Sequence, residues 1–162
     1  FFTNAQAQEE GESVLSLGVG FVTFYTGETS LPPISIAYDY GYSDEISIGG
    51  YLGYASASEE FGNAFIGNYE WTYTYIIAGV RGLYHYEVID GIDTYGGALL
   101  GFNIASATLE GDNTVNVPEP SVGGFTYNIF VGGRYYFNDN FAAFLELGYG
   151  IAAVNLGLSY KL

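Results

Sequence analysis

The stretch that decides the fold is YNIFVGGRYYFNDNFAAFLELGYGIAAVNLGLSYKL, residues 127–162. Apolar and aromatic residues recur at every second position from Tyr127 to Phe137, a period typical of β-strands. After the turn Asn138-Asp139-Asn140, the same alternation runs over 143–149 and again over 154–162. The stretch therefore predicts three consecutive strands, each with one consistently apolar face.

The second face of these strands indicates what surrounds the sheet. It carries Arg134, Glu146 and Lys161 among glycine, alanine and aromatic residues. The outer face of a soluble sandwich should instead be rich in lysine, glutamate and threonine. Isolated charges of opposite sign suit a narrow closed interior, and the apolar face suits lipid, so the pattern predicts a membrane β-barrel.

Several short segments resemble a known family, the small outer-membrane β-barrels of Bacteroidetes-type bacteria, related in architecture to the eight-stranded OmpX and OmpA barrels. The matching segments are residues 133–137, the turn 138–140, residues 146–150 and 155–161, with weaker matches at 95–97 and 100–103. The resemblance implies an eight-stranded barrel, a Gram-negative outer membrane and a signal peptide. It implies almost nothing about activity.

Composition agrees with a single membrane domain of 162 residues. Although 49% of the residues are hydrophobic, no apolar run approaches the roughly 18 to 20 residues that a spanning helix needs. Only a helix or a closed sheet satisfies every backbone group in lipid. The 17 Tyr and 12 Phe suit interfacial girdles, and the 24 Gly suit tight curvature. The alternative is a soluble all-β sandwich.

The N-terminal residues are expected to lie outside the barrel. Phe1–Ala7 resemble the end of a signal peptide, with a small-x-small cleavage site at Ala5-Gln6-Ala7 and a mature start at Gln8. A disordered tail is the alternative. We therefore divide the chain into a signal-peptide remnant and tail, 1–12, and a barrel domain, 13–162. The absence of cysteine excludes disulfides and thiol catalysis.

The net charge of −15 arises from 18 acidic residues against three basic ones. Nucleic acid is excluded as a partner, because no basic patch could neutralise phosphate. The three basic residues fall on predicted inward positions. We expect every carboxylate except Asp39 and Glu146 to lie in a turn, a loop or the tail.

Alternation along the whole chain predicts eight strands of an up-and-down antiparallel barrel. The first five are expected at residues 14–25, 34–42, 46–54, 71–86 and 94–106. The connections 43–45, 87–93 and 138–140 are short, whereas 56–70 and 107–125 are long. Outer-membrane barrels have short periplasmic turns and longer outside loops. The chain is therefore expected to cross the outer membrane many times, with both termini in the periplasm.

The predicted interior holds a polar set of six residues: Asp39, Arg81, His85, Arg134, Glu146 and Lys161. An eight-stranded barrel is just wide enough to be filled by side chains, and charges buried there must be paired. Arg134 and Glu146 lie on consecutive strands within cross-strand distance, so we expect them to form a pair. A structural network is the main interpretation, and a proton or ion path is the alternative.

Catalytic and metal sites receive little support from the sequence. The single histidine, His85, and strand-end serines such as Ser43 show no Ser-His-acid spacing, so we expect no enzyme. Glu110, Asp112, Asn113 and Glu119 could supply oxygen ligands to calcium, but their spacing matches no EF-hand. We treat them as solvated loop charges and expect neither metal nor cofactor.

Tyrosines dominate the predicted lipid-facing surface, and they form either aromatic belts or a face for a larger partner: Tyr38, Tyr40, Tyr42, Tyr54, Tyr84, Tyr86, Tyr135 and Tyr160. The expected partners are outer-membrane lipid or lipopolysaccharide, and a larger outer-membrane complex. The sequence thus predicts a structural or interaction protein that presents extracellular loops or serves as an accessory subunit. A small pore for ions or solutes is the alternative.

Overall fold

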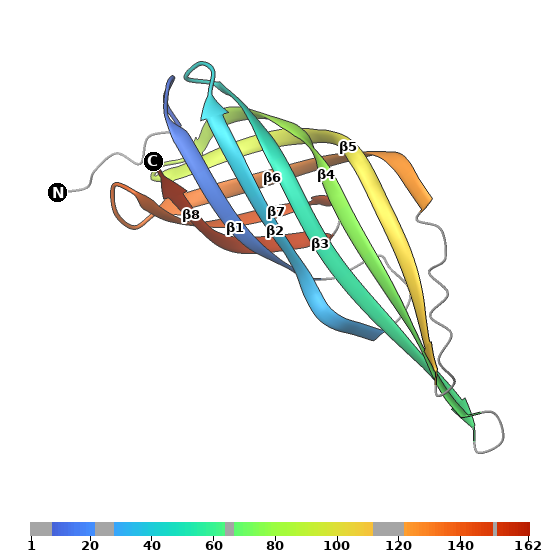
Figure 1. Cartoon of the computed structure of the whole chain (residues 1–162). Coiled ribbons are helices and arrows are strands. Elements are labelled where there is room, and N and C mark those ends of the chain that lie inside the picture. The colour runs from blue at the N-terminus through green and yellow to red at the C-terminus, as the bar shows by residue number, and fades with distance from the viewer. Residues whose placement is uncertain (1–7, 22–27, 64–66, 112–121, 151) are drawn as a thin grey trace.

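The computed structural model describes residues 8–21, 28–63, 67–111, 122–150 and 152–162. Eight strands form a closed antiparallel barrel in which each strand pairs with its sequence neighbours and β8 pairs with β1 (Figure 1). No helix in these ranges is long and apolar enough to cross a membrane. The strands are β1 (Ser13–Phe21), β2 (Glu28–Gly41), β3 (Ile46–Asn63), β4 (Gly67–Ile89), β5 (Ile92–Gly111), β6 (Val122–Tyr136), β7 (Phe141–Tyr149) and β8 (Val154–Lys161).

The two ends of the barrel differ. One end, here named the terminus end, carries the start of β1, the end of β8 and the short connections β2–β3, β4–β5 and β6–β7. The Leu162 amide donates a hydrogen bond to the Ser13 carbonyl there, at 2.8 Å. We name the opposite end, where the longest strands finish, the loop end. The expected asymmetry between the two ends is present in the lengths of the strands, but not in the connections as predicted, because only residues 64–66 join β3 to β4 and only residues 150–153 join β7 to β8.

Side chains alternate between the lumen and the outer surface as the period of two predicts. Ile129 is 65% exposed on the outside, whereas its sequence neighbour Asn128 is buried inside. The strand alignment that placed Arg81 inward in β4 is confirmed, because Arg81, Leu83 and His85 are all buried. The register between β4 and β5 is regular up to Tyr86 and shifts only between Tyr86 and Ile89.

Strands β3, β4 and β5 are much longer than predicted, with 18, 23 and 20 residues. Most of the expected polar loop 56–70 is strand, since 56–63 pair with β4 and 67–70 belong to β4. Residues 107–111 and 122–125, expected in the longest loop, are strand as well, and 112–121 lie outside the described residues. The predicted loops are wrong because polar residues do not by themselves indicate a loop: a strand that lies outside lipid carries them freely.

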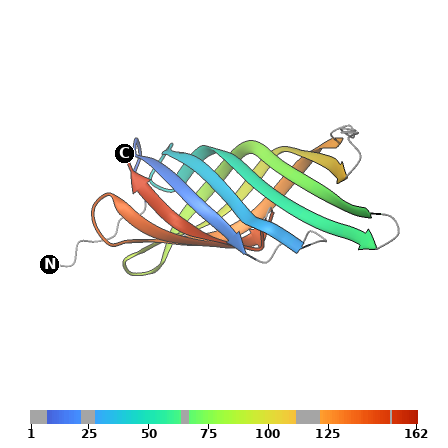
Figure 2. The same ribbon diagram turned by 60° about the horizontal axis from the view of Figure 1, so that its bottom comes forward.

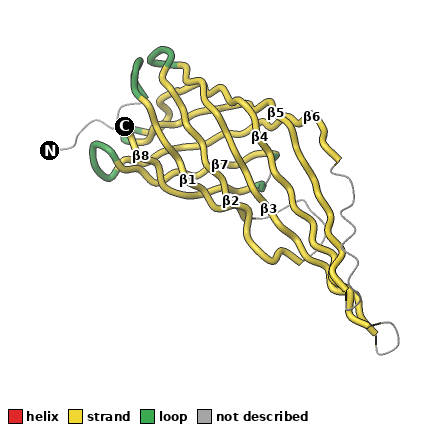
Figure 3. The backbone as a smooth tube through the Cα atoms, in the orientation of Figure 1, coloured by secondary structure: helices red, strands yellow, loops and turns green. Residues whose placement is uncertain are grey.

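The additional length forms a three-stranded extension that we name the projecting sheet. It consists of residues 59–63 of β3, 67–74 of β4 and 106–111 of β5. β2 accompanies β3 only as far as the pair Glu28 and Ser58, and β6 accompanies β5 only as far as Val122 and Ala105. Beyond those pairs, the three strands continue together away from the barrel (Figures 1 and 3). By contrast, β1, β7 and β8 have nine, nine and eight residues.

Three smaller boundary predictions also change. β2 starts at Glu28, so most of the expected loop 26–33 is strand, with register shifts around the prolines that cannot donate to the ladder. The connector predicted at 87–93 is a hairpin with Ile89 opposite Ile92. Residues 22–25, assigned to the first strand, and Phe1–Ala7, assigned to the signal peptide, lie outside the described residues.

Candidate functional site

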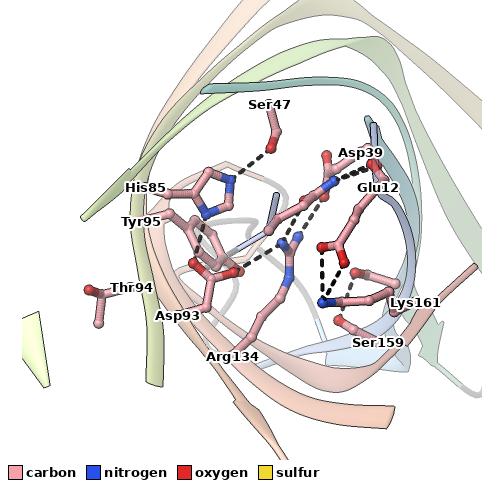
Figure 4. A network of polar contacts seen from close by, with 12 residues as sticks. Glu12, Asp39, Ser47, His85, Asp93, Thr94, Tyr95, Arg134, Ser159 and Lys161 are labelled. Atoms are coloured by element: carbon pink, nitrogen blue, oxygen red, sulfur yellow. Dashed lines mark hydrogen bonds and ion pairs between the residues drawn. The ribbon is translucent and has the colours of Figure 1, made fainter. Parts of the chain in front are cut away.

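The centre of the lumen is an ionic network built around Asp39 of β2. Arg81 of β4 donates to both carboxylate oxygens, with Nε 2.7 Å from Oδ1 and Nη2 2.6 Å from Oδ2. Arg134 of β6 donates to Oδ2 through Nη2, also at 2.6 Å (Figure 4). Asp39 and Arg134 have no exposed surface. One buried carboxylate therefore holds two guanidinium groups that come from two different strands of the barrel wall.

Glu146 of β7 extends the network toward the loop end. Its Oε1 accepts hydrogen bonds from Arg81 Nη1 at 3.1 Å and from the Tyr95 hydroxyl at 2.9 Å. The ring of Tyr95 also lies under Arg134, with 4.8 Å from the guanidinium carbon to the ring centroid, a cation–π geometry. Tyr95 thus contacts both Glu146 and Arg134, which are not paired with each other.

The predicted pair of Arg134 and Glu146 is wrong. The two residues do lie on adjacent strands, but Glu146 is opposite Gly132, and Arg134 is opposite Phe144. Arg134 turns toward Asp39, and it also lies 3.7 Å from Asp93. The reason is that the narrow lumen lets long side chains cross it, so a partner on the far wall is as near as one on the adjacent strand.

A second hydrogen-bonded group lies nearer the terminus end. His85 Nδ1 is 2.7 Å from Asp93 Oδ1, and His85 Nε2 is 2.8 Å from Ser47 Oγ (Figure 4). A serine, a histidine and an aspartate thus contact one another in the order found in serine hydrolases. Ser47 has no exposed surface, however, so no substrate can reach its oxygen in this arrangement. The contacts give each of the three buried side chains a hydrogen-bond partner, and only Asp93 Oδ2 has none.

Sequence reasoning missed Ser47 and Asp93, although a signal existed for both. Ser47 lies between Ile46 and Ile48, two apolar residues exposed on the outside, so alternation puts it inside. Asp93 precedes Tyr95 by two positions, and Tyr95 faces the lumen, so the same alternation puts Asp93 inside. The expectation that all carboxylates except two lie outside strands is therefore wrong for Asp93, and also for those at positions 28, 59, 60, 70, 87 and 110.

The segment Gln8–Glu12, expected as part of the tail, covers the terminus end of the lumen. The buried side-chain amide of Gln8 donates to the carbonyl of Asp39 at 3.0 Å, and its oxygen accepts from Arg134 at 3.3 Å. Glu12 forms an ion pair with Lys161 at 2.9 Å (Figure 4). Gly11 adopts a φ of 86°, which permits the turn. No sequence signal pointed to this cap.

The network leaves little free space in the lumen. A cavity of about 40 Å³ lies on the loop-end side of Arg81 and Glu146, next to Asn128 and Asn155. That volume accommodates water but no larger solute. Toward the terminus end, the described side chains of the ionic network and of the His85 group occupy the lumen. No group of three or more His, Asp or Glu within the described ranges is arranged to hold a metal ion.

The predicted outward tyrosines are on the outer surface. Seven are exposed, and Tyr54 is half-buried: Tyr38, Tyr40, Tyr42, Tyr84, Tyr86, Tyr135, Tyr160 and Tyr54. They share this surface with aliphatic residues such as Leu17, Val80 and Leu158, each more than half exposed. A water-soluble protein would expose this much contiguous apolar surface only at an interface.

A closed sheet with an apolar outside and a paired ionic interior defines the class: the chain is an eight-stranded antiparallel transmembrane β-barrel. No protein-family model and no curated protein matches its sequence. Solved structures do match. The N-terminal β-barrel domain of OprF from Pseudomonas aeruginosa aligns with a TM-score of 0.57 and 16% identity, covering 95% of this chain and 98% of that one.

Two further structures support the same fold. Ail, the attachment invasion locus protein of Yersinia pestis, solved in complex with the heparin analogue sucrose octasulfate, gives a TM-score of 0.56 at 18% identity over 94% of this chain and 99% of Ail. A de novo designed transmembrane β-barrel gives 0.52 at 17% identity, over 97% and 100%. At these identities, the likeness concerns the fold.

Proposed function

We propose that the protein is an integral outer-membrane barrel with a structural or interaction role, which presents the projecting sheet outside the cell. The observation that carries this proposal is the unequal length of the strands. Strands β3 to β5 continue as a paired sheet well beyond the apolar band, whereas β1, β7 and β8 stop near it. Ordering that many residues costs conformational entropy, and the barrel wall does not need them.

The ionic network supports a structural role for the lumen. Its charged groups contact one another, and the His85 group is closed to solvent. We propose accordingly that the protein is not an enzyme and holds no cofactor. The expected small pore has less support, because side chains fill the lumen on the terminus-end side of the 40 Å³ cavity.

The charge of the projecting sheet indicates the kind of partner. It contains Glu59, Glu60, Glu70 and Glu110 but no lysine or arginine. Glu70 lies directly opposite Glu60 on one side and Glu110 on the other. A sheet that carries four acidic residues and no basic one favours a cationic partner over an anionic one. We therefore propose a basic partner, in contrast to the polyanionic heparin analogue bound by Ail.

The edge of β5 offers a mode of contact. From Ser106 to Gly111, no described strand pairs with β5 on its β6 side. An unpaired edge accepts an extended segment through backbone hydrogen bonds. The six residues lack the lysine and proline that commonly protect edges. The proposed partner thus adds a basic strand at this edge, which would make the barrel an accessory subunit of a larger envelope complex.

Localisation and orientation belong to the same proposal. We propose that the protein lies in the outer membrane with both termini in the periplasm, in contact with outer-membrane lipid or lipopolysaccharide. The barrel class and the short terminus-end turns support this proposal. The assignment to a Bacteroidetes-type bacterium remains a prediction from the sequence.

The experiment is gentle extraction from the native membrane followed by native mass spectrometry. We expect a complex of fixed stoichiometry that dissociates when Glu60, Glu70 and Glu110 are all changed to glutamine. The matched control changes Glu87, Glu45 and Asp44 to their amides at the opposite end, with the same loss of charge. A barrel that is always alone, or a complex that survives the first triple change, contradicts the proposal.

A further inference from the structure

The β4–β5 hairpin departs from the barrel wall at the terminus end. The register shifts between Tyr86 and Ile89, and the Thr94 hydroxyl fixes this irregularity by donating to the Tyr86 carbonyl and accepting from the Val88 amide. Gly91, with a φ of 84°, completes the turn. Val88 is 69% exposed, and Figure 2 shows the hairpin extending away from the barrel body.

An apolar groove of about 560 Å³ lies between this hairpin and the outer surface of β6 and β7. Gly133 and Ala143 line the groove and leave space in it, because neither has a long side chain. Most of its other lining residues are aliphatic or aromatic and lie on the outer surface of the barrel, among them Val88, Ile89, Val131, Tyr135, Leu145 and Leu147.

An acidic depression lies on the other side of the same hairpin, and Tyr86 lines both hollows. Glu9, Asp44, Glu45 and Glu87 surround it. None of the three lysine and arginine side chains, all of which lie in the described ranges, neutralises them there, because Arg81 and Arg134 are buried in the lumen network and Lys161 is paired with Glu12. The two hollows together are apolar on one side and strongly acidic on the other.

We propose that this pair of hollows binds a membrane lipid whose headgroup carries a free ammonium, with an acyl chain in the groove and the ammonium among the carboxylates. An apolar groove alone cannot select a lipid, since every acyl chain is equally apolar. Selection therefore comes from the headgroup: the carboxylates attract an ammonium and repel a headgroup with net negative charge. The proposal requires the transmembrane fold but not the external partner.

The test is native mass spectrometry of the full chain in mixed micelles containing equal amounts of phosphatidylethanolamine and phosphatidylglycerol. We expect phosphatidylethanolamine to be retained several-fold over phosphatidylglycerol. Ala143→Phe, which fills the groove, should abolish retention of both lipids. Ala98→Phe is the control, because Ala98 is also exposed on the outside but does not line the groove.

A second comparison separates this site from the overall charge of the protein. Changing Glu45 and Glu87 together to glutamine should remove the preference between the lipids, whereas Glu59→Gln with Glu110→Gln should leave it unchanged. Equal retention of both lipids by the wild type overturns the proposal, as does wild-type retention in Ala143→Phe. The external complex is measured separately, so either proposal can fail without the other.

Discussion

Asp39 illustrates how single buried residues determine the lumen. It is the shared acceptor of two guanidinium groups, and none of the three side chains can exchange its partner for water. Removing one member of a buried ionic group costs more than the group contributes, because charges remain behind without compensation. The network therefore tolerates change poorly at Asp39.

We predict that Asp39→Asn lowers the free energy of unfolding by about 3 to 5 kcal/mol, since both arginines lose their shared carboxylate. Urea-induced unfolding of the protein in lipid vesicles measures the change. Asp139→Asn, in the exposed β6–β7 turn, is the control and should have almost no effect. A loss at Asp39 no larger than at Asp139 would show that the arginines find other acceptors.

Ser47 provides a second test at this scale. We predict that a fluorophosphonate probe, which reacts with activated serines, does not label the folded protein, because Ser47 has no exposed surface. Mass spectrometry of the treated protein measures labelling, and a known serine hydrolase in the same detergent is the positive control. Labelling that disappears in Ser47→Ala would refute the proposal that the protein is not an enzyme.

All six lumen residues were predicted to face inward, four of them from alternation and Arg81 with His85 from an alignment of β4 that puts the arginine inside. The strand pattern did not predict which of these residues contact one another. A strand pattern states which face a residue occupies, but Arg134 reaches Asp39 across the lumen, and no sequence distance encodes that crossing. Gln8 was unpredictable for a related reason, because it contributes to the lumen from outside any strand.

At the level of elements, the barrel wall depends on glycines whose missing side chains make room for neighbours. Gly49 and Gly50 are adjacent in β3 but face opposite sides. A Cβ at Gly49 would collide with the Tyr38 carbonyl oxygen and lie 2.5 Å from Asp39 Oδ1, whereas one at Gly50 would meet nothing within 4 Å. The same change is therefore expected to have opposite consequences at neighbouring positions.

We predict that Gly49→Ala destabilises the barrel by about 1 to 3 kcal/mol, as overpacking of a filled interior does. Gly50→Ala should be neutral or stabilise by about 0.4 to 1 kcal/mol, because it only restricts the unfolded chain. The electrophoretic shift between folded and heat-unfolded protein, followed against temperature, measures both. Equal stability of the two variants would mean that the interior adjusts more easily than its contacts indicate.

The ends of the long strands are the part of the fold that the sequence did not predict. All eight strands were found, and the register of β4 was correct, because one face of each strand meets lipid and cannot be polar. That constraint disappears above the membrane. Positions 56–63 and 106–111 keep their backbone pairing but no longer need an apolar face, so hydropathy could not distinguish them from loop.

At the scale of the whole molecule, the proposed orientation is open to a direct test, because the chain contains no cysteine. We predict that Asn63→Cys, at the tip of β3, reacts with a membrane-impermeant maleimide on intact cells. Asp139→Cys, at the terminus end, should react only after the outer membrane is permeabilised. The reverse pattern would invert the barrel and move the projecting sheet into the periplasm.

We further predict that the purified wild-type barrel produces no discrete current steps in planar bilayers, because side chains fill its lumen. Arg81→Ala with Glu146→Ala, which enlarges the 40 Å³ cavity, is the informative variant. Steps in the wild type that change with this variant would favour the pore alternative. Steps that are identical in both would indicate a contaminant.

The contacts that seal the terminus end also determine when folding is complete. Gln8 and Arg134 are separated by 126 residues, and Glu12 and Lys161 by 149, while β1 and β8 join the two extremes of the sheet. Contacts of such separation are slow to form, because the intervening chain must first be ordered. The Glu12–Lys161 ion pair and the β1–β8 pairing both require the last strand. A chain halted before β8 therefore leaves Glu12 without Lys161 and the β1 edge unpaired, whereas Gln8 can still contact Asp39 and Arg134. The cap of the lumen is thus complete only when the barrel is closed.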